Sequence, residues 1–150
     1  MTEAKITDFT ASATGGEFRL SAHKGHPVVI YFYPKDSTPG CTMEGAQFRD
    51  LHRKFEKAGA VVVGVSRDSL KSHENFKTKM GFPFELISDE DEKLCKQFGV
   101  MKMKNMYGRK VRGIERSTFV IDARGALACE WRAVKVAGHA QEVLDFVATL

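Results

Sequence analysis

The hydrophobic pattern of the chain contains two continuous apolar runs, at residues 28–33 and 60–66. Runs of this length that are rich in β-branched residues are typical of strands buried on both faces of a sheet. Between them, apolar side chains recur at three- and four-residue spacings, which predicts a helix from Pro39 to about Lys57 with one apolar face. These apolar positions are Phe48, Leu51, Phe55 and Ala58. Strand, helix and strand in this order predict a βαβ unit with parallel strands and a right-handed crossover.

Turn and capping residues mark further elements on either side of this unit. Gly15-Gly16 lies between two short apolar stretches of the segment 9–20, which predicts a hairpin ahead of the main sheet. After the second apolar run, Asp68 or Ser69 is a suitable N-cap for a helix of about a dozen residues that Gly81 ends. The chain therefore continues the alternation of strands and helices.

The middle of the chain predicts one more strand and helix. A short strand is expected at residues 84–87, and Ser88 or Asp89 is a suitable cap for a helix that runs through Cys95 to Gly99. The following segment, rich in methionine and lysine, is expected to be a loop.

The last third of the chain predicts a hairpin and a closing helix. Extended segments at 114–121 and 126–134 flank the turn sequence 122–125, which indicates antiparallel strands. The terminal helix should present one apolar face, formed by Val143, Leu144, Val147 and Leu150.

A βαβ unit followed by a ββα unit is the thioredoxin arrangement. The predicted fold class is therefore α/β, a thioredoxin fold with an N-terminal β-hairpin and an inserted strand and helix. With 150 residues and 43% apolar content, the chain is expected to form one domain over residues 1–150. No stretch approaches the ~20 apolar residues of a membrane span, and the start of the chain lacks the pattern of a signal peptide. We therefore expect a cytoplasmic protein without a membrane partner.

The formal charge of +4 and the pI near 9.0 raise the possibility of nucleic-acid binding. The basic residues are spread along the chain except for one local cluster, which is more typical of solvated surface, so no nucleic-acid partner is expected. This cluster is Lys102, Lys104, Arg109, Lys110 and Arg112. The five histidines have no spacing typical of metal ligands, and no glycine-rich phosphate loop occurs. We expect no metal and no other cofactor.

The most specific chemical signal is Cys41, which follows the first predicted strand by a few residues. Pro34 ends that strand, because proline lacks the amide that the next ladder bond would need. Thr38 is a good N-cap and Pro39 suits the first helical position, so Cys41 falls in the first turn of the helix. Unpaired backbone amides and the positive end of the helix dipole meet there. This environment favours a thiolate, the nucleophilic form of cysteine.

Pro34, Thr38 and Cys41 match the signature Pro-x-x-x-Thr-x-x-Cys, and the chain here resembles the peroxiredoxins, thiol peroxidases that reduce hydrogen peroxide and organic hydroperoxides. Residues 31–36, 38–42 and 48–50 resemble the PrxQ, or bacterioferritin-comigratory-protein, branch of that family. Segments 87–91, 97–100 and 113–122 resemble the same branch, so the resemblance covers nearly the whole chain.

The resemblance implies a role for each signature residue. Cys41 would attack the peroxide, Thr38 would orient it, Pro34 would shield the site from water, and Arg116 would stabilise the negative charge. Each of the last three also has a simpler explanation: Thr38 as a helix cap, Pro34 as a strand terminator, and Arg116 as an ion pair or an extended side chain at the sheet edge. Arg116 is expected on the same side of its strand as residues 114, 118 and 120.

Two further residues of the predicted helix are weaker candidates. Glu44 has the alternative of an ordinary acid in the first turn, where it interacts with the helix dipole. Arg49 also resembles a family residue, but a surface ion pair is an equally good interpretation.

The chain departs from the family in its other cysteines. Many members of the branch have a second cysteine five residues after the first, where this chain has Ala46, and others have one near the position of Lys77. Cys95 lies in a predicted helix, and Cys129 is expected to share a strand face with residues 127 and 131, so both resemble small core residues.

These cysteines predict how the oxidised thiol is reduced. The preferred interpretation is a one-cysteine mechanism, in which an external thiol of the thioredoxin, glutaredoxin or glutathione type reduces Cys41. A two-cysteine mechanism through Cys95 and a non-enzymatic peroxide sensor are the alternatives. A monomer is expected.

Overall fold

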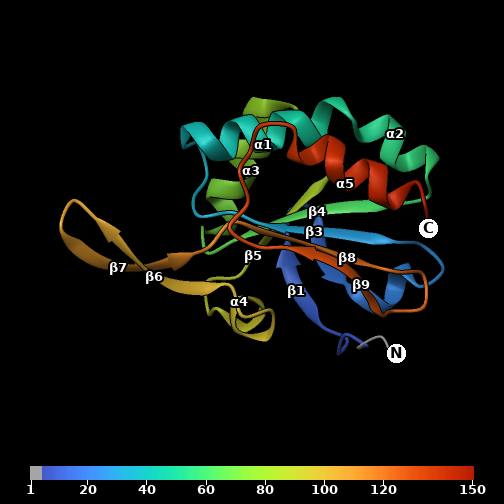
Figure 1. Ribbon diagram of the computed structural model, residues 1–150, viewed down its shortest axis with the longest axis horizontal. Coiled ribbons are helices and arrows are strands. Elements are labelled where there is room, and N and C mark those ends of the chain that lie inside the picture. Colours follow the sequence, from blue (N-terminus) through green and yellow to red (C-terminus); the bar gives the residue numbers. More distant parts are fainter. Residues whose placement is uncertain (1–4) are drawn as a thin grey trace.

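The computed structural model describes residues 5–150 and contains a seven-stranded sheet covered on both faces (Figure 1). The strand order is β2-β1-β5-β4-β3-β8-β9, and a separate two-stranded sheet is formed by β6 and β7. The strands of the main sheet are β1 Thr10–Ala13, β2 Gly16–Arg19, β3 Val28–Phe32, β4 Val61–Ser66, β5 Glu85–Ser88, β8 Ser117–Ile121 and β9 Leu127–Trp131. This mixed α/β architecture is the predicted thioredoxin fold with its N-terminal hairpin.

The central strand β3 is buried on both faces, as its apolar run predicts. It pairs in parallel with β4 and antiparallel with β8. Val29 and Tyr31 belong to a helix-side core, which packs against α1, α2, α3 and α5. Ile30 and Phe32 belong to an opposite core, which includes Phe18 of β2 and residues of α4.

The helices that cover the helix-side core are α1 Pro39–Asp50, α2 His52–Lys57, α3 Leu70–Met80 and α5 His139–Val147. The expected single helix from Pro39 to Lys57 is wrong in one respect, because Leu51 leaves helical geometry (φ −98°, ψ 2°) and separates α1 from α2. Phe48 and Phe55 nevertheless lie in the same core with ring centroids 5.8 Å apart, so the predicted apolar face survives the break.

The capping predictions for α3 are confirmed. The side chain of Ser69 accepts a hydrogen bond from the Ser72 amide at 3.1 Å, and Gly81 adopts the left-handed conformation (φ 65°) that ends the helix. The following helix, α4 Lys93–Gln97, is shorter than expected. The carboxylate of Asp89 accepts hydrogen bonds from the amides of residues 94 and 95, although Asp89 itself lies before the helix.

The segment predicted as a methionine- and lysine-rich loop is instead a hairpin of β6 Met101–Met106 and β7 Arg109–Ile114, which extends away from the main sheet (Figure 1). The turn between its strands has positive φ at both Tyr107 (53°) and Gly108 (79°), as a two-residue hairpin requires. Tyrosine is unusual at such a position, and most of this hairpin is exposed, so neither the turn nor a buried face revealed the strands.

The predicted extended segment 114–121 is divided. β7 ends at Ile114 and β8 begins at Ser117, with Arg116 in the connection between them. Ile114 packs in the opposite core while Val120 packs in the helix-side core, so the expectation that residue 114 lies on the same side as residues 118 and 120 is wrong.

The antiparallel pairing of β8 with β9 is confirmed, with an irregularity between Val120 and Ile121. Because of this shift, Leu127 packs against the opposite core while Cys129 and Trp131 pack against the helix-side core. The expected common face of these three residues is therefore wrong. In α5, residues 143, 144 and 147 are buried as predicted, but Leu150 lies beyond the helix and is exposed.

No helix within the described residues combines the length and the apolar character needed to cross a membrane.

Candidate active site

Cys41 lies in the first turn of α1, at the carboxyl end of β3, as the sequence predicts. Thr38 occupies the N-cap position with extended backbone (φ −83°, ψ 156°), and its carbonyl accepts a hydrogen bond from the Thr42 amide at 2.9 Å. Pro39 is the first helical residue. Pro34 is partly buried and lies in the connection from β3 to α1.

The hydroxyl of Thr38 does not cap the helix as expected. It donates a hydrogen bond to the carbonyl oxygen of Lys35 at 2.8 Å, and the N-cap accepts no bond through its side chain. The first amides of α1 therefore receive no side-chain acceptor from Thr38, and the Thr38 hydroxyl oxygen is not bonded to a helix amide.

Arg116 reaches Cys41 from the connection between β7 and β8. Its Nη2 donates to Sγ of Cys41 at 3.5 Å, and its Nη1 donates to Oε1 of Glu44 at 2.7 Å. Cys41 is 2% exposed, and the side chains of Arg116 and Glu44 are 15% and 0% exposed. A guanidinium beside a buried sulfur stabilises negative charge on that sulfur.

Glu44 is more closely involved in the site than an ordinary first-turn acid. Burial raises the pKa of its carboxyl group to about 7, because it outweighs the opposing effect of Arg116. Its second oxygen, Oε2, is buried without a hydrogen-bond partner within the described residues, and the hydroxyl of Tyr31 shares this property.

Tyr31 is the residue of this group that the sequence reasoning missed. Burial raises its pKa well above the usual value, and the negative charges of Glu44 and Cys41 act in the same direction. The apolar run identified Tyr31 only as a strand residue. A hydroxyl within an otherwise apolar buried strand was the available signal.

Arg49 lies away from this group. Its guanidinium donates to the carbonyl oxygen of Met80 at 2.9 Å and to the side chain of Asp50 at 3.0 Å, so it joins α1 to the end of α3. The surface ion pair considered for Arg49 is thus present, and neither of these two hydrogen bonds involves Cys41.

All three cysteines are free thiols. Cys95 is fully buried in the opposite core, so the sheet separates it from Cys41, which belongs to the helix-side core. Burial raises the pKa of the Cys95 thiol, and Asp89 raises it further. Cys129 is partly buried against the helix-side core. At the two positions where the family resemblance led us to look for a second cysteine, Ala46 is partly buried in α1 and Lys77 forms an ion pair with Glu85 at 2.7 Å.

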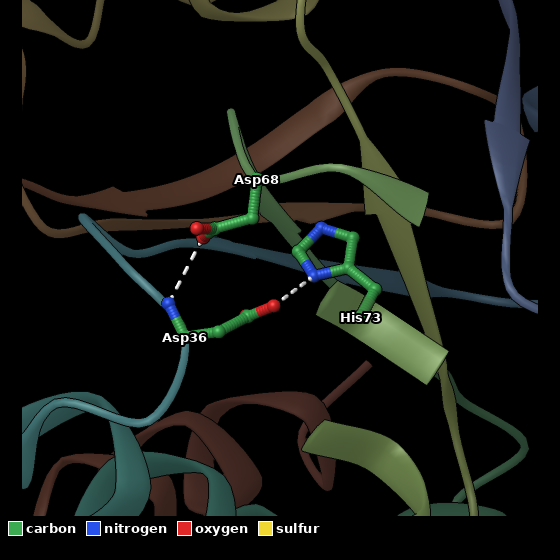
Figure 2. A group of neighbouring side chains, drawn as sticks. All are labelled: Asp36, Asp68 and His73. Atoms are coloured by element: carbon green, nitrogen blue, oxygen red, sulfur yellow. Dashed lines mark hydrogen bonds and ion pairs between the residues drawn. The ribbon is translucent and has the colours of Figure 1, made fainter. Parts of the chain in front are cut away.

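Histidine spacing in the sequence indicated no metal site, but the fold brings together Asp36, Asp68 and His73, whose potential ligand atoms lie within 4.8 Å of one another (Figure 2). Within residues 5–150, it is the one group of at least three His, Cys, Asp or Glu side chains with this spacing. The sequence did not reveal this group, because Asp36 lies far from Asp68 and His73 along the chain.

Comparison with known proteins identifies the family. Residues 2–129 match the model of the AhpC/TSA family. The chain is 59% identical over 142 residues to peroxiredoxin Bcp of Xanthomonas campestris, an alignment that covers 94% of this chain and 89% of the relative. It is 48% identical to peroxiredoxin Bcp of Bacillus subtilis, with 94% and 90% covered. The chain belongs to the AhpC/TSA family and is a peroxiredoxin of the Bcp/PrxQ type.

Solved structures agree with this identification of the peroxiredoxin. A cysteine mutant of Xanthomonas campestris peroxiredoxin Q superposes with a TM-score of 0.92 at 54% identity, covering 99% of both chains. BcpB of Mycobacterium tuberculosis superposes with a TM-score of 0.87 at 32% identity, covering 99% of this chain and 97% of that chain. The protein is therefore a thiol peroxidase, an oxidoreductase that uses a peroxide and a thiol reductant.

Proposed function

We propose that this peroxiredoxin reduces hydrogen peroxide and organic hydroperoxides through a sulfenic acid on Cys41. The observation that carries the proposal is the hydrogen bond from Nη2 of Arg116 to Sγ of Cys41, at the N-terminal turn of α1. Both the helix amides and the guanidinium favour a thiolate there. Among the three cysteines, Cys41 is the one with this combination of partners.

The thiolate attacks the terminal oxygen of the peroxide. A sulfur–oxygen bond forms as the oxygen–oxygen bond breaks, and the leaving oxygen takes up a proton to become water or an alcohol. Sulfur is oxidised by two electrons and the peroxide is reduced by two. Arg116 stabilises the negative charge that moves from sulfur to the leaving oxygen.

Thr38 is suited to orient the peroxide. Its hydroxyl hydrogen is used in the bond to the Lys35 carbonyl, so the oxygen is available as an acceptor. A hydroperoxide carries an O–H donor, which we propose binds to this oxygen. Pro34, from the same connection, has no amide hydrogen to offer and shields the site from water.

The class of substrate is supported by a relative. The structure of Xanthomonas campestris bacterioferritin comigratory protein, which superposes with a TM-score of 0.89 at 56% identity and covers 94% of this chain and 90% of that chain, was solved to study its alkyl peroxide reduction activity. We propose that organic hydroperoxides are substrates of the present protein as well.

We propose that an external thiol of the thioredoxin, glutaredoxin or glutathione type reduces Cys41. The first thiol condenses with the sulfenic acid to give a mixed disulfide and water, and a second thiol releases Cys41 and leaves as a disulfide. The position of Cys95 in the opposite core favours this route. A direct Cys41–Cys95 bond would need Cα atoms within about 7 Å of each other, or a large rearrangement.

The test is peroxide consumption by the wild type and by Cys41→Ser, Cys95→Ser and Cys129→Ser, each supplied with thioredoxin, glutaredoxin or glutathione. We expect Cys41→Ser to be inactive and the other two variants to turn over many equivalents with at least one donor. Loss of turnover in Cys95→Ser would support the two-cysteine alternative. Consumption of a single equivalent by the wild type with every donor would indicate a sensor instead of an enzyme. A cytoplasmic location and a monomeric state remain predictions from the sequence.

A further inference from the structure

Asp36, in the connection between β3 and α1, is a buried acid outside the group around Cys41. It is 7% exposed, and its carboxylate accepts three hydrogen bonds. Oδ1 accepts from the Tyr33 hydroxyl at 2.6 Å, and Oδ2 accepts from Ser72 Oγ at 2.8 Å and from His73 Nδ1 at 2.7 Å (Figure 2 shows the last of these). Two of these donors lie on α3, so the carboxylate ties the connection to that helix.

The backbone of Asp36 is held as well. Its amide donates to Oδ2 of Asp68 at 2.9 Å, and the same oxygen accepts from Ser66 Oγ at 2.5 Å. Asp68 lies between β4 and α3. The neighbouring Ser37 has φ 61°, a left-handed conformation that a serine rarely adopts, so these bonds hold a bent segment in place.

The hydrogen bonds of His73 occupy both of its ring nitrogens. The side chain is fully buried on α3, with Nδ1 at 2.7 Å from Asp36 Oδ2 and Nε2 at 2.9 Å from the carbonyl oxygen of Ile87. A carbonyl only accepts, so Nε2 carries hydrogen. The ring faces Asp36 from the connection, Asp68 from the end of β4 and a carbonyl of β5. The hydroxyls of Tyr33 and Ser66 lie 3.5 Å from its ring nitrogens.

This bonding pattern argues against a metal ion between Asp36, Asp68 and His73, although their spacing would permit one. Nε2 donates to the Ile87 carbonyl and Nδ1 is bonded to Asp36, so neither ring nitrogen has a free lone pair to offer. Both oxygens of Asp36 and Oδ2 of Asp68 are already bonded to Tyr33, Ser72, His73, Ser66 and the Asp36 amide. The arrangement is a hydrogen-bonded pair.

We propose that Asp36 and His73 are positioning residues for the reaction of Cys41 with peroxide. Asp36 lies two residues before Thr38. It also directly follows Lys35, whose carbonyl oxygen accepts the hydrogen bond from the Thr38 hydroxyl. Tyr33, bound to the same carboxylate, directly precedes Pro34. The hydrogen-bonded pair of Asp36 and His73 therefore fixes the segment that presents Thr38 and Pro34 to the peroxide. This proposal rests on the proposed role of Cys41.

The test uses Asp36→Asn, His73→Gln and the double variant, with His26→Gln as a control at an exposed histidine that precedes the start of β3. One readout is the single-turnover rate of Cys41 oxidation by peroxide. The second is the rate of Cys41 alkylation by iodoacetamide, which needs neither Thr38 nor Pro34. Circular dichroism establishes that each variant is folded.

We expect peroxide oxidation to slow by about ten- to a hundred-fold in both single variants, because misplacement by about 1 Å can have an effect of this size. The alkylation rate should change by less than about two-fold, and the double variant should be no slower than the slower single variant, since both substitutions break one pair. In the wild type, nitrogen NMR should show hydrogen on Nε2 of His73, the nitrogen that faces the Ile87 carbonyl.

Several results would overturn the proposal. These are unchanged peroxide rates in the folded single variants, equal losses in both rates, additive losses in the double variant, or an Nε2 of His73 without hydrogen. Zinc binding by the wild type that His73→Gln abolishes would show a metal site instead. If Cys41 is not oxidised even in the wild type, the proposed role of Cys41 fails. Normal oxidation in every variant would instead leave the role of Cys41 intact and overturn only the role of Asp36 and His73.

Discussion

Arg116 passes so close to Gly40 that a Cβ atom at position 40 would lie 3.1 Å from Nη2 of the arginine. The same nitrogen donates to Sγ of Cys41. The absence of a side chain at position 40 therefore leaves room for the guanidinium at the sulfur, and Gly40 becomes part of the geometry of the site without any chemical group of its own.

We predict that Gly40→Ala slows Cys41 oxidation without destabilising the protein. The added methyl group pushes the guanidinium by a few tenths of an ångström, whereas alanine is the better helix former by up to about 1 kcal/mol. Stopped-flow peroxide oxidation and thermal unfolding measure the two effects. An unchanged rate would show that the position of Nη2 is not critical.

Gly45→Ala is the matched control in the same helix and should behave in the opposite way. A Cβ atom there would lie 2.4 Å from the ring of Phe82, which belongs to the helix-side core. Overpacking of this kind lowers the free energy of unfolding by about 1–3 kcal/mol. A lower melting temperature in Gly45→Ala, with no such loss in Gly40→Ala, would separate packing from chemistry.

Arg116→Ala should decrease the rate constant for peroxide by about a hundred- to a thousand-fold, the usual effect of removing one donor to a developing negative charge. Arg116→Lys should recover only part of the rate, because an ammonium group cannot contact Cys41 and Glu44 through two separate nitrogens of a planar fork. The measurement is stopped-flow oxidation of the reduced protein. Arg53→Ala, at an exposed arginine of α2, serves as the control and should match the wild type; an equal rate in Arg116→Ala would remove the guanidinium from the mechanism.

The raised pKa of Glu44 predicts that the stability of the protein depends on pH. Its pKa is raised from the usual 4.5 to about 7 in the folded protein, so between these values the folded state binds more protons than the unfolded state. The free energy of unfolding should therefore fall as the pH rises through this range. At about 1.4 kcal/mol per pKa unit, the loss is at most about 3–4 kcal/mol.

Urea unfolding of the wild type and of Glu44→Gln at a series of pH values measures this effect. The free energy of the wild type, relative to that of the variant, should decrease from about pH 4.5 to about pH 7 and then become constant. A difference that stays flat across this range would mean that Glu44 is charged throughout and that Arg116 outweighs burial.

The sequence pattern predicted the strands and helix ends that depend on residues close to one another along the chain. The uninterrupted apolar run at 28–33 identified a strand buried on both faces, and Ser69 and Gly81 identified the ends of α3. The hairpin β6–β7 was missed because most of its length is exposed and Tyr107, at positive φ, gave no turn signal.

The site was predictable only where the motif and the family resemblance reached. Cys41, Thr38 and Arg116 were candidates from the sequence, but the direction of the Thr38 hydroxyl was not predicted, because its acceptor is a carbonyl of the preceding segment. The burial of Glu44 depends on the core around α1, and the pairing of Asp36 with His73 joins residues 37 positions apart. No periodicity in a single sequence records contacts of this kind.

Cys95 should be the least reactive thiol of the native protein. It is fully buried, its pKa is raised by burial and by Asp89, and the sheet lies between it and Cys41. Because the thiolate is the reactive form, brief treatment with iodoacetamide at neutral pH should modify Cys41 and leave Cys95 unmodified.

Peptide mass mapping measures this, with protein unfolded in guanidinium chloride as the control in which all three cysteines react. The same mapping after one equivalent of peroxide should find the sulfenic acid or its trapped adduct on Cys41 and no bond between Cys41 and Cys95. Since each thiol belongs to a different core, such a bond would require the chain to open from one face of the sheet to the other. Its detection would establish that opening as a step of the catalytic cycle and replace the one-cysteine mechanism.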